Sequence, residues 1–371
     1  MSIKRNILLN PGPVTTTNSV KMAQVVPDIC PREKDFGRLL NSISKDLTNL
    51  SGNNLDYVTI LFGGSGTAGL DATINSVVAP KSKILVINNG AYGKRMAEIA
   101  TTYSIDLHEL KFRWNEIADT KEIEKVLKKD KKIQYVAVVH HETTTGILNP
   151  LKKIGNLAKK YKKTFIVDAI SSFGGIPFNI NECNIDFMVS VANKCLQGMP
   201  GICFVVCKKK ELEKLKNYPK RSYYLNLFEQ YQFFRDKQEM RFTPPVQIAY
   251  SLRKAIDELL EEGIHNRCKR YVRNFKVLKE GIAKLGFHTL LKPEHESRLL
   301  ITVKYPKHPN FRFEELHDRL YAKGFTIYPG KIGALQTFRL AVIGDLKVND
   351  IDNFLVALDI VMDEMKINLI N

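Results

Sequence analysis

The sequence lacks the features that mark membrane, secreted and metal-binding proteins. Its 371 residues contain no apolar run near the ~18 residues that a membrane helix needs. The apolar run at 7–9 is too short for the core of a signal peptide. The six cysteines form no CxxC pair, and the eight histidines form no HExxH motif. We therefore expect a cytoplasmic protein with reduced cysteines and no bound metal.

Acidic residues are scarce relative to basic ones. The chain has 39 Asp and Glu against 56 Lys and Arg, which gives a net charge of +17. Such a charge can indicate a nucleic-acid-binding protein, but the lysines lie in short runs along the whole chain without aromatic residues between them. We interpret them as a solvated surface and expect no nucleic-acid partner. The positive field would still attract small anions.

The first two thirds of the chain have the rhythm of an α/β fold. Short apolar runs rich in β-branched residues, each ending in polar residues, occur at 58–62, 84–87, 135–139, 165–167 and 187–191. The segments between them have helical spacing, as in Leu70, Ile74 and Val77. This alternation predicts a mostly parallel sheet, with ligands bound at the carboxyl ends of its strands.

The pattern changes near residues 243–245, where two prolines follow a threonine. Helical patterns then cover 246–262, 266–285, 313–322 and 348–365, and apolar runs at 299–303 and 325–328 predict strands. We predict a large domain over residues 15–245 and a smaller α+β domain over residues 246–371.

A glycine-rich loop, Gly63-Gly64-Ser65-Gly66-Thr67, lies between a predicted strand and a predicted helix. Glycines let the backbone approach a phosphate, and the amino end of the helix offers free N–H groups and a partial positive charge. The loop matches neither GxxxxGK[ST] nor GxGxxG, so a nucleotide-binding fold gains no support. A simple turn remains the alternative.

Two charged residues follow apolar strands. Asp168 ends one strand, and a buried carboxylate needs a partner, which is either a local cap or ion pair or the protonated ring nitrogen of a cofactor. Lys194 follows the next strand. A solvated lysine is the common case, but a desolvated lysine loses its proton more readily and becomes a nucleophilic amine.

The motifs together resemble the class V aminotransferases. The resemblance rests on the segments 10–16 (NPGPVTT), 64–67 (GSGT), 89–93 (NGAYG), 141–146 (HETTTG), 167–175 (VDAISSFGG), 192–201 (ANKCLQGMPG), 241–245 (RFTPP), 328–331 (YPGK) and 338–340 (FRL). These motifs occur in order over nearly the whole chain. The resemblance implies a fold-type I transferase dependent on pyridoxal 5'-phosphate, with a seven-stranded type of sheet and an N-terminal segment, 1–14, near the active site.

The resemblance also implies a role for individual residues. Lys194 would carry the cofactor and Asp168 would pair with its ring nitrogen. Ser65, Gly66 and Thr67 would hold its phosphate, Tyr92 would stack on its ring, and Thr145 would lie near its ring oxygen. Thr243 would reach the phosphate of a neighbouring subunit, which implies a homodimer. Arg339 and Gly12 would bind the substrate.

Within the family, the motifs are most similar to those of the enzymes that move the amino group of 2-aminoethylphosphonate to pyruvate. The alternative is a relative that pairs alanine or serine with glyoxylate or pyruvate. A cysteine desulfurase would need a reactive cysteine in the smaller domain, and Cys268 lies in a helical pattern. A basic nucleic-acid-binding protein and an aminotransferase-like protein without catalysis are the readings from other classes.

Overall fold

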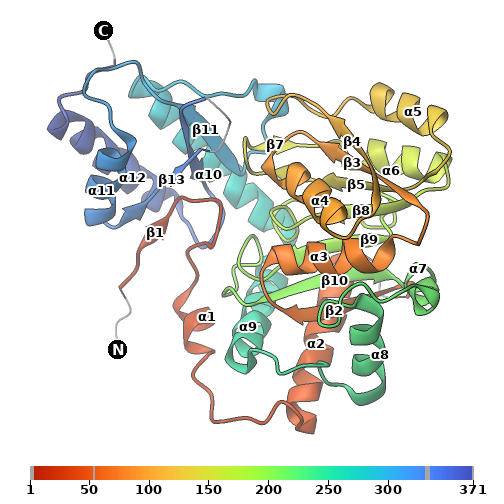
Figure 1. Ribbon diagram of the computed structural model, residues 1–371. Coiled ribbons are helices and arrows are strands. Elements are labelled where there is room, and N and C mark those ends of the chain that lie inside the picture. Colours follow the sequence, from red (N-terminus) through yellow and green to blue (C-terminus); the bar gives the residue numbers. More distant parts are fainter. Residues whose placement is uncertain (1–3, 53–54, 331–334, 370–371) are drawn as a thin grey trace.

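The structure, a computed structural model, describes residues 4–52, 55–330 and 335–369, so Lys331 of the YPGK motif lies outside it. The chain forms a large α/β part and a smaller part beside it (Figure 1). The large part is built on one seven-stranded sheet. In spatial order its strands are β2 (Tyr57–Gly63), β10 (Ile202–Lys208), β9 (Phe187–Val191), β8 (Thr164–Asp168), β5 (Ile133–Val139), β3 (Lys83–Asn88) and β4 (Asp106–Lys111).

The sheet is mostly parallel, as predicted. Only β10 runs antiparallel to its two neighbours, β2 and β9. The five predicted strands are present as β2, β3, β5, β8 and β9. The edge strand β4 was not predicted, because its sequence Asp-Leu-His-Glu-Leu-Lys is polar and half exposed. An edge strand buries less apolar surface than a central one, so its apolar signal is weak.

Helices cover both faces of the sheet (Figure 1). On one face lie α3 (Gly66–Val77), α4 (Ala91–Thr102), α7 (Lys209–Lys214) and α8 (Leu227–Lys237). The other face is covered by α2 (Lys34–Leu50), α5 (Thr120–Lys129), α6 (Leu151–Lys160) and α9 (Val246–Glu262). Each face therefore has its own apolar core.

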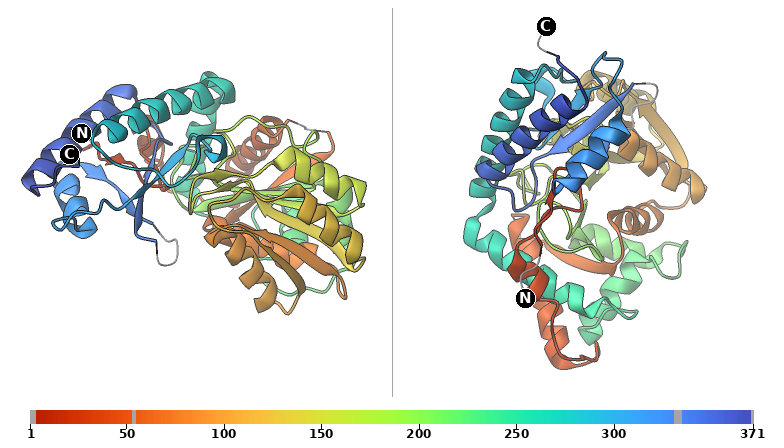
Figure 2. Two further views of the ribbon diagram at one scale, coloured as in Figure 1. Left: turned by 90° about the horizontal axis from the view of Figure 1, so that it is seen from above. Right: turned by 90° about the vertical axis from the view of Figure 1, so that its left-hand side faces the viewer.

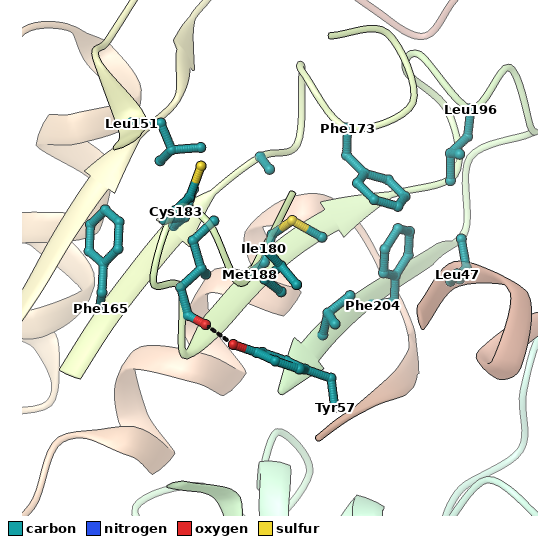
Figure 3. Packing of buried hydrophobic residues seen from close by; sticks show 14 of the residues in the cluster. Leu47, Tyr57, Leu151, Phe165, Phe173, Ile180, Cys183, Met188, Leu196 and Phe204 are labelled. Atoms are coloured by element: carbon teal, nitrogen blue, oxygen red, sulfur yellow. Dashed lines mark hydrogen bonds between the residues drawn. The ribbon is translucent and has the colours of Figure 1, made fainter. Parts of the chain in front are cut away.

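Figure 3 shows the core under the second group of helices, where Phe173 packs edge-on against Phe204 with ring centres 5.6 Å apart. The ring of Tyr57 lies in the same core, and its hydroxyl donates a 2.7 Å hydrogen bond to the carbonyl of Ile185. That bond satisfies the one polar group of the side chain, so the ring is buried without an unpaired hydroxyl.

The smaller part combines helices with short strands. Its helices are α10 (Ile264–Lys284), α11 (Phe313–Ala322) and α12 (Val348–Glu364). Its antiparallel sheet has the order β11 (Leu300–Lys304), β14 (Thr337–Ala341) and β13 (Tyr328–Pro329). Short elements complete the described chain: α1 (Asn18–Met22), β6 (His141–Glu142), β7 (Ile147–Leu148), and the 3-10 helices Leu215–Asn217 and Pro293–His295.

The N-terminal segment belongs to the smaller part. Strand β1 (Ile7–Leu8) pairs in parallel with β12 (Phe325–Thr326). Ile7, Leu9 and Val14 are buried in the core formed by α10, α11 and α12. Figure 2 shows the two parts side by side, with the first segments of the chain lying against the smaller part.

Helix α9 lies beyond the division that we predicted after residue 245, yet its buried side chains Ala249, Leu252 and Ile256 pack in the core of the large sheet. Helix α10 supplies the first side chains of the second core after α9, such as Tyr271 and Phe275. The predicted domain limits remain a prediction, and the cores change between these two helices. No helix in the described part of the chain is long and apolar enough to cross a lipid bilayer.

Candidate active site

The predicted site residues meet at the carboxyl edge of the parallel strands. Asp168 ends β8, and its strand pairs with β5 and β9 on either side. Lys194 follows β9, the glycine-rich loop follows β2, and Tyr92 lies in the first turn of α4 after β3. A cavity of about 500 Å³ opens here, lined by Gly64, Ser65, Gly66, Thr67, Tyr92, Arg95, Ile170, Val191, Asn193, Lys194, Pro200 and Gly201.

The glycine-rich loop ends in the amino terminus of α3. Ser65 is the N-cap residue, and its side chain forms no capping hydrogen bond with the described helix. The first N–H groups of α3 therefore face the cavity as donors for an anion. A Cβ atom on Gly66 would lie 2.7 Å from Cδ1 of Ile170, so a larger residue here would require the Ile170 side chain to move.

Lys194 lies half-buried at the floor of the cavity, in contact with the N-terminal segment. Its Nζ donates to the carbonyl oxygen of Pro11. Burial lowers the pKa of Lys194 to about 8, and the positive charges of Arg339 and Arg95 act in the same direction. A substantial fraction of this amine is therefore neutral near physiological pH, as a nucleophile or proton acceptor requires.

Asp168 carries a buried carboxyl group that forms no ion pair with any residue the structure describes. Its Oδ1 accepts a 2.9 Å hydrogen bond from the backbone N–H of Ile170. Burial raises the pKa of Asp168 to about 7, and the neighbouring Glu142 adds to the rise, while Arg95 and Lys194 oppose it. A cation placed against this carboxylate would be strongly favoured.

Tyr92 and Arg95 lie one turn apart on α4. The guanidinium of Arg95 stacks on the Tyr92 ring at 4.8 Å from its centre. Its Nη1 also donates to Oγ1 of Thr67, at 3.3 Å. Arg95 was not predicted from the sequence, although its position three residues after Tyr92 places both on one face of a helix. This spacing is the feature of the sequence that could have identified Arg95 as a neighbour of Tyr92.

Glu142 holds the first turn of α4 in place. Its Oε2 accepts from the backbone N–H groups of Tyr92 and Gly93, at 3.2 and 3.1 Å. Its Oε1 accepts from the N–H and the hydroxyl of Thr144. Burial raises the pKa of Glu142, and these four donors oppose the rise. Glu142 was not predicted from the sequence, because its burial depends on tertiary packing.

Several buried polar atoms near this edge have no hydrogen-bond partner among the described residues. They include Oγ1 of Thr143, Oγ1 of Thr145, Nε2 of His141 and Oδ1 of Asn10. Buried polar atoms without partners are costly in a finished structure, so a polar ligand is expected to contact them. Together with the cavity, the open helix terminus and the lysine, they fit a phosphorylated aromatic cofactor such as pyridoxal phosphate.

Arg339, on β14, lies next to this site although it does not line the cavity itself. Its Nη1 donates to the carbonyl of Thr143 at 3.0 Å, and its Nη2 donates to the carbonyl of Pro329 at 2.9 Å. It is only 2% exposed, and none of the ion pairs among the described residues includes it. Burial lowers its pKa, and the phenols of Tyr92 and Tyr328 oppose that change.

The remaining predicted residues occupy contrasting positions. Gly12 packs directly on the side chain of Lys194, and Thr145 is fully buried behind the cavity. Thr243 is exposed and is not among the residues that line the cavity of its own chain. The other predicted residues lie in one region, and Pro245, two residues after Thr243, packs against Gly63 of the glycine-rich loop.

Comparisons with known proteins agree with this geometry. Residues 22–335 match the family model of class V aminotransferases. A protein of Phocaeicola vulgatus named 2-aminoethylphosphonate–pyruvate transaminase is 42% identical over 95% of this chain and 98% of its own. A Salmonella paratyphi C protein of the same name is 39% identical over 96% and 98%.

Solved structures give the same result. Ureidoglycine–glyoxylate aminotransferase from Bacillus subtilis superposes with a TM-score of 0.90 at 25% identity, over 99% of this chain and 95% of that one. Alanine–glyoxylate aminotransferase from Nostoc sp. has a TM-score of 0.90 at 25% identity, over 98% and 96%. This chain belongs to the class V aminotransferase family and is a transaminase that uses pyridoxal phosphate.

Proposed function

We propose that this enzyme transfers the amino group of 2-aminoethylphosphonate to pyruvate, which gives phosphonoacetaldehyde and L-alanine. The observation that carries the proposal is the buried guanidinium of Arg339 beside Lys194, without a carboxylate partner among the described residues, in a chain whose relatives are named for this reaction. Both substrates are small anions, so one arginine can bind the phosphonate and the carboxylate in turn by charge-assisted hydrogen bonds.

Each site residue then has a task. Pyridoxal phosphate, when bound, supplies a ring that withdraws electrons from the substrate's amine-bearing carbon. Lys194 is the residue that would carry it, and its Nζ in the neutral form would take a proton from that carbon and deliver it to the cofactor carbon that receives the amino group. Asp168 would keep a ring nitrogen protonated by pairing with it. Tyr92 would stack on the ring, and Thr145 would donate to its ring oxygen.

Binding and orientation come from the rest of the site. Ser65, Gly66 and Thr67 would hold the cofactor phosphate at the amino end of α3. Gly12, whose backbone packs on Lys194, would contact the substrate, while Arg339 anchors its anionic end. The carbonyls of Thr143 and Pro329 fix the orientation of that guanidinium.

The test is a substrate panel with the cofactor-loaded enzyme. It offers 2-aminoethylphosphonate with pyruvate, and in parallel alanine or serine with glyoxylate or pyruvate, with Lys194→Ala as the blank. We expect alanine and phosphonoacetaldehyde to form only with the phosphonate pair. Turnover confined to the other pairs would contradict the proposed substrates. It would favour the glyoxylate type of enzyme, which the two structural neighbours represent by name.

The exposed position of Thr243 supports a homodimer, in which this residue would reach the cofactor phosphate of the other subunit. Around it lie large exposed aromatic residues, with Tyr223 78% exposed and Tyr224 stacked on Phe242 at 4.9 Å. Exposed aromatic side chains are typical of protein interfaces. Light scattering tests the proposal, and a monomer that retains full activity would contradict it.

A cytoplasmic location is the remaining part of the proposal. All six cysteines are free thiols in the structure, which suits a reducing compartment. Fractionation of cells that produce the protein would test this, and recovery outside the cytoplasm would contradict it.

A further inference from the structure

Arg95 is a cation of the cavity that the roles above do not use. It lines the cavity together with Ser65, Gly66 and Thr67. Its Nη1 donates to Oγ1 of Thr67 at 3.3 Å. Among the residues that the structure describes, it takes part in no ion pair. An arginine without a carboxylate partner beside an open helix terminus is arranged to meet an anion.

The position of Arg95 is fixed from two sides. Its guanidinium stacks on the Tyr92 ring at 4.8 Å. The backbone of Tyr92 and Gly93 is in turn held by the buried carboxylate of Glu142. Because α4 is anchored in this way, the guanidinium needs little reorganisation to bind a ligand at the amino end of α3.

We propose that Arg95 binds the phosphate of pyridoxal phosphate, together with the amino terminus of α3 and the hydroxyl of Thr67. The positions of the two arginines favour a cofactor phosphate, and not the substrate, as the ligand of Arg95. Arg95 contacts the phosphate loop directly, whereas Arg339 is held on a different element by the carbonyls of Thr143 and Pro329. The two arginines thus serve two anions, one of the cofactor and one of the substrate.

The test compares the cofactor with its analogue that lacks the phosphate. Cofactor-free wild type, Arg95→Gln and Arg95→Lys are titrated with pyridoxal phosphate and with pyridoxal by equilibrium dialysis. Lys94→Gln is the matched control, since Lys94 is the adjacent residue, carries the same charge and is exposed in an ion pair with Glu98. No substrate is used, so the result is independent of the proposed reaction.

We expect Arg95→Gln to raise the dissociation constant for pyridoxal phosphate by about 10- to 100-fold. This is the usual effect of losing a hydrogen bond to a charged group. Pyridoxal should bind all four proteins about equally, and Arg95→Lys should recover part of the affinity because it keeps the charge. An equal loss for both ligands would overturn the proposal and assign Arg95 to positioning Tyr92. Unchanged binding of both ligands to Arg95→Gln would also overturn it. If Arg95→Gln does not fold, the same comparison with Arg95→Lys tests the proposal. If Arg95 binds the phosphate, this variant should lose affinity for pyridoxal phosphate but not for pyridoxal.

Discussion

The backbone of Gly12 lies directly on the side chain of Lys194. A Cβ atom at residue 12 would be 2.5 Å from Cδ and 2.6 Å from Nζ of that lysine. The φ angle of Gly12 is +123°, a conformation that other residues rarely adopt. The carbonyl of the preceding Pro11 accepts a hydrogen bond from the same Nζ. The N-terminal segment therefore packs directly against the amine of Lys194.

Gly12→Ala should lower kcat by roughly tenfold or more, because the added methyl group displaces Lys194 or the segment above it. Steady-state kinetics and the absorbance of the bound cofactor measure the effect. Gly324→Ala is the matched control, since Gly324 also has a positive φ, +90°, but has no atom within 4 Å of the added methyl group. Equal losses of kcat in the two variants would show that backbone strain, and not contact with Lys194, is responsible.

Asp168→Asn should stabilise the cofactor-free protein at pH 8. The native pKa of Asp168 is raised to about 7 from 3.8, so the native state holds its proton more tightly than the unfolded state. Stability is therefore lost as pH rises from about 4 to about 7. Removing the carboxylate removes this cost, which is on the order of a few kcal/mol.

Thermal unfolding of wild type and Asp168→Asn at several pH values checks this prediction. The difference in Tm should be positive at pH 8 and should shrink toward pH 4. With pyridoxal phosphate bound, the sign should reverse, because the carboxylate then has a cationic partner. A variant that is less stable at pH 8 without the cofactor would contradict the unpaired state of Asp168.

The uptake of pyridoxal phosphate by the cofactor-free enzyme should follow the ionisation of Lys194. Its pKa is lowered to about 8 by burial, so roughly one tenth of the amine is neutral at pH 7. The rate of uptake should rise with pH and level off above about 8. Stopped-flow absorbance measures it, and a midpoint near the ordinary lysine value of 10.5 would show that the amine is solvated.

Arg339→Lys should raise the KM for both substrates by roughly tenfold, and Arg339→Gln by more. A lysine keeps the charge but loses the planar pair of donors that fits a carboxylate or a phosphonate. Arg312→Lys is the control, since Arg312 also donates to backbone carbonyls but lies exposed on the surface. Unchanged KM values for both substrates in Arg339→Lys would remove this residue from the substrate site.

Glu142→Ala should lower Tm and weaken binding of the cofactor, because three backbone N–H groups, of Tyr92, Gly93 and Thr144, lose their acceptor. Each buried N–H left unpaired costs about 1–3 kcal/mol. Glu98→Ala on the exposed side of α4 removes a surface ion pair, for which we expect a change within about 0.5 kcal/mol. Denaturant unfolding compares the two, and equal effects would contradict the anchoring role of Glu142.

The sequence was sufficient to predict the part of the site that depends on strand ends. Asp168 and Lys194 each follow a buried apolar run, and the carboxyl ends of parallel strands meet at one edge. The glycine loop before α3 was recognisable for the same reason. The order of the strands and the reversal of β10 were not predicted, because periodicity shows that a strand is buried but not which strand is its neighbour.

The unpredicted parts depend on packing between distant segments. Strand β1 has two residues, too few for a periodic pattern, and its partner β12 is about 320 residues away. Arg95 and Glu142 are charged residues in ordinary polar surroundings of the sequence, and only the folded chain shows one lining the cavity and the other fully buried.

The pairing of β1 with β12 also sets the order in which the enzyme can be assembled. Residues 7 and 8 are synthesised before the large sheet, but their partners Phe325 and Thr326 are synthesised after it. The last strand of the large sheet ends at Lys208. The sheet can therefore form before β12, the partner of the N-terminal segment, has been synthesised. The contact of the N-terminal segment with Lys194 is therefore completed after the large sheet, and a chain still being synthesised would have Lys194 uncovered.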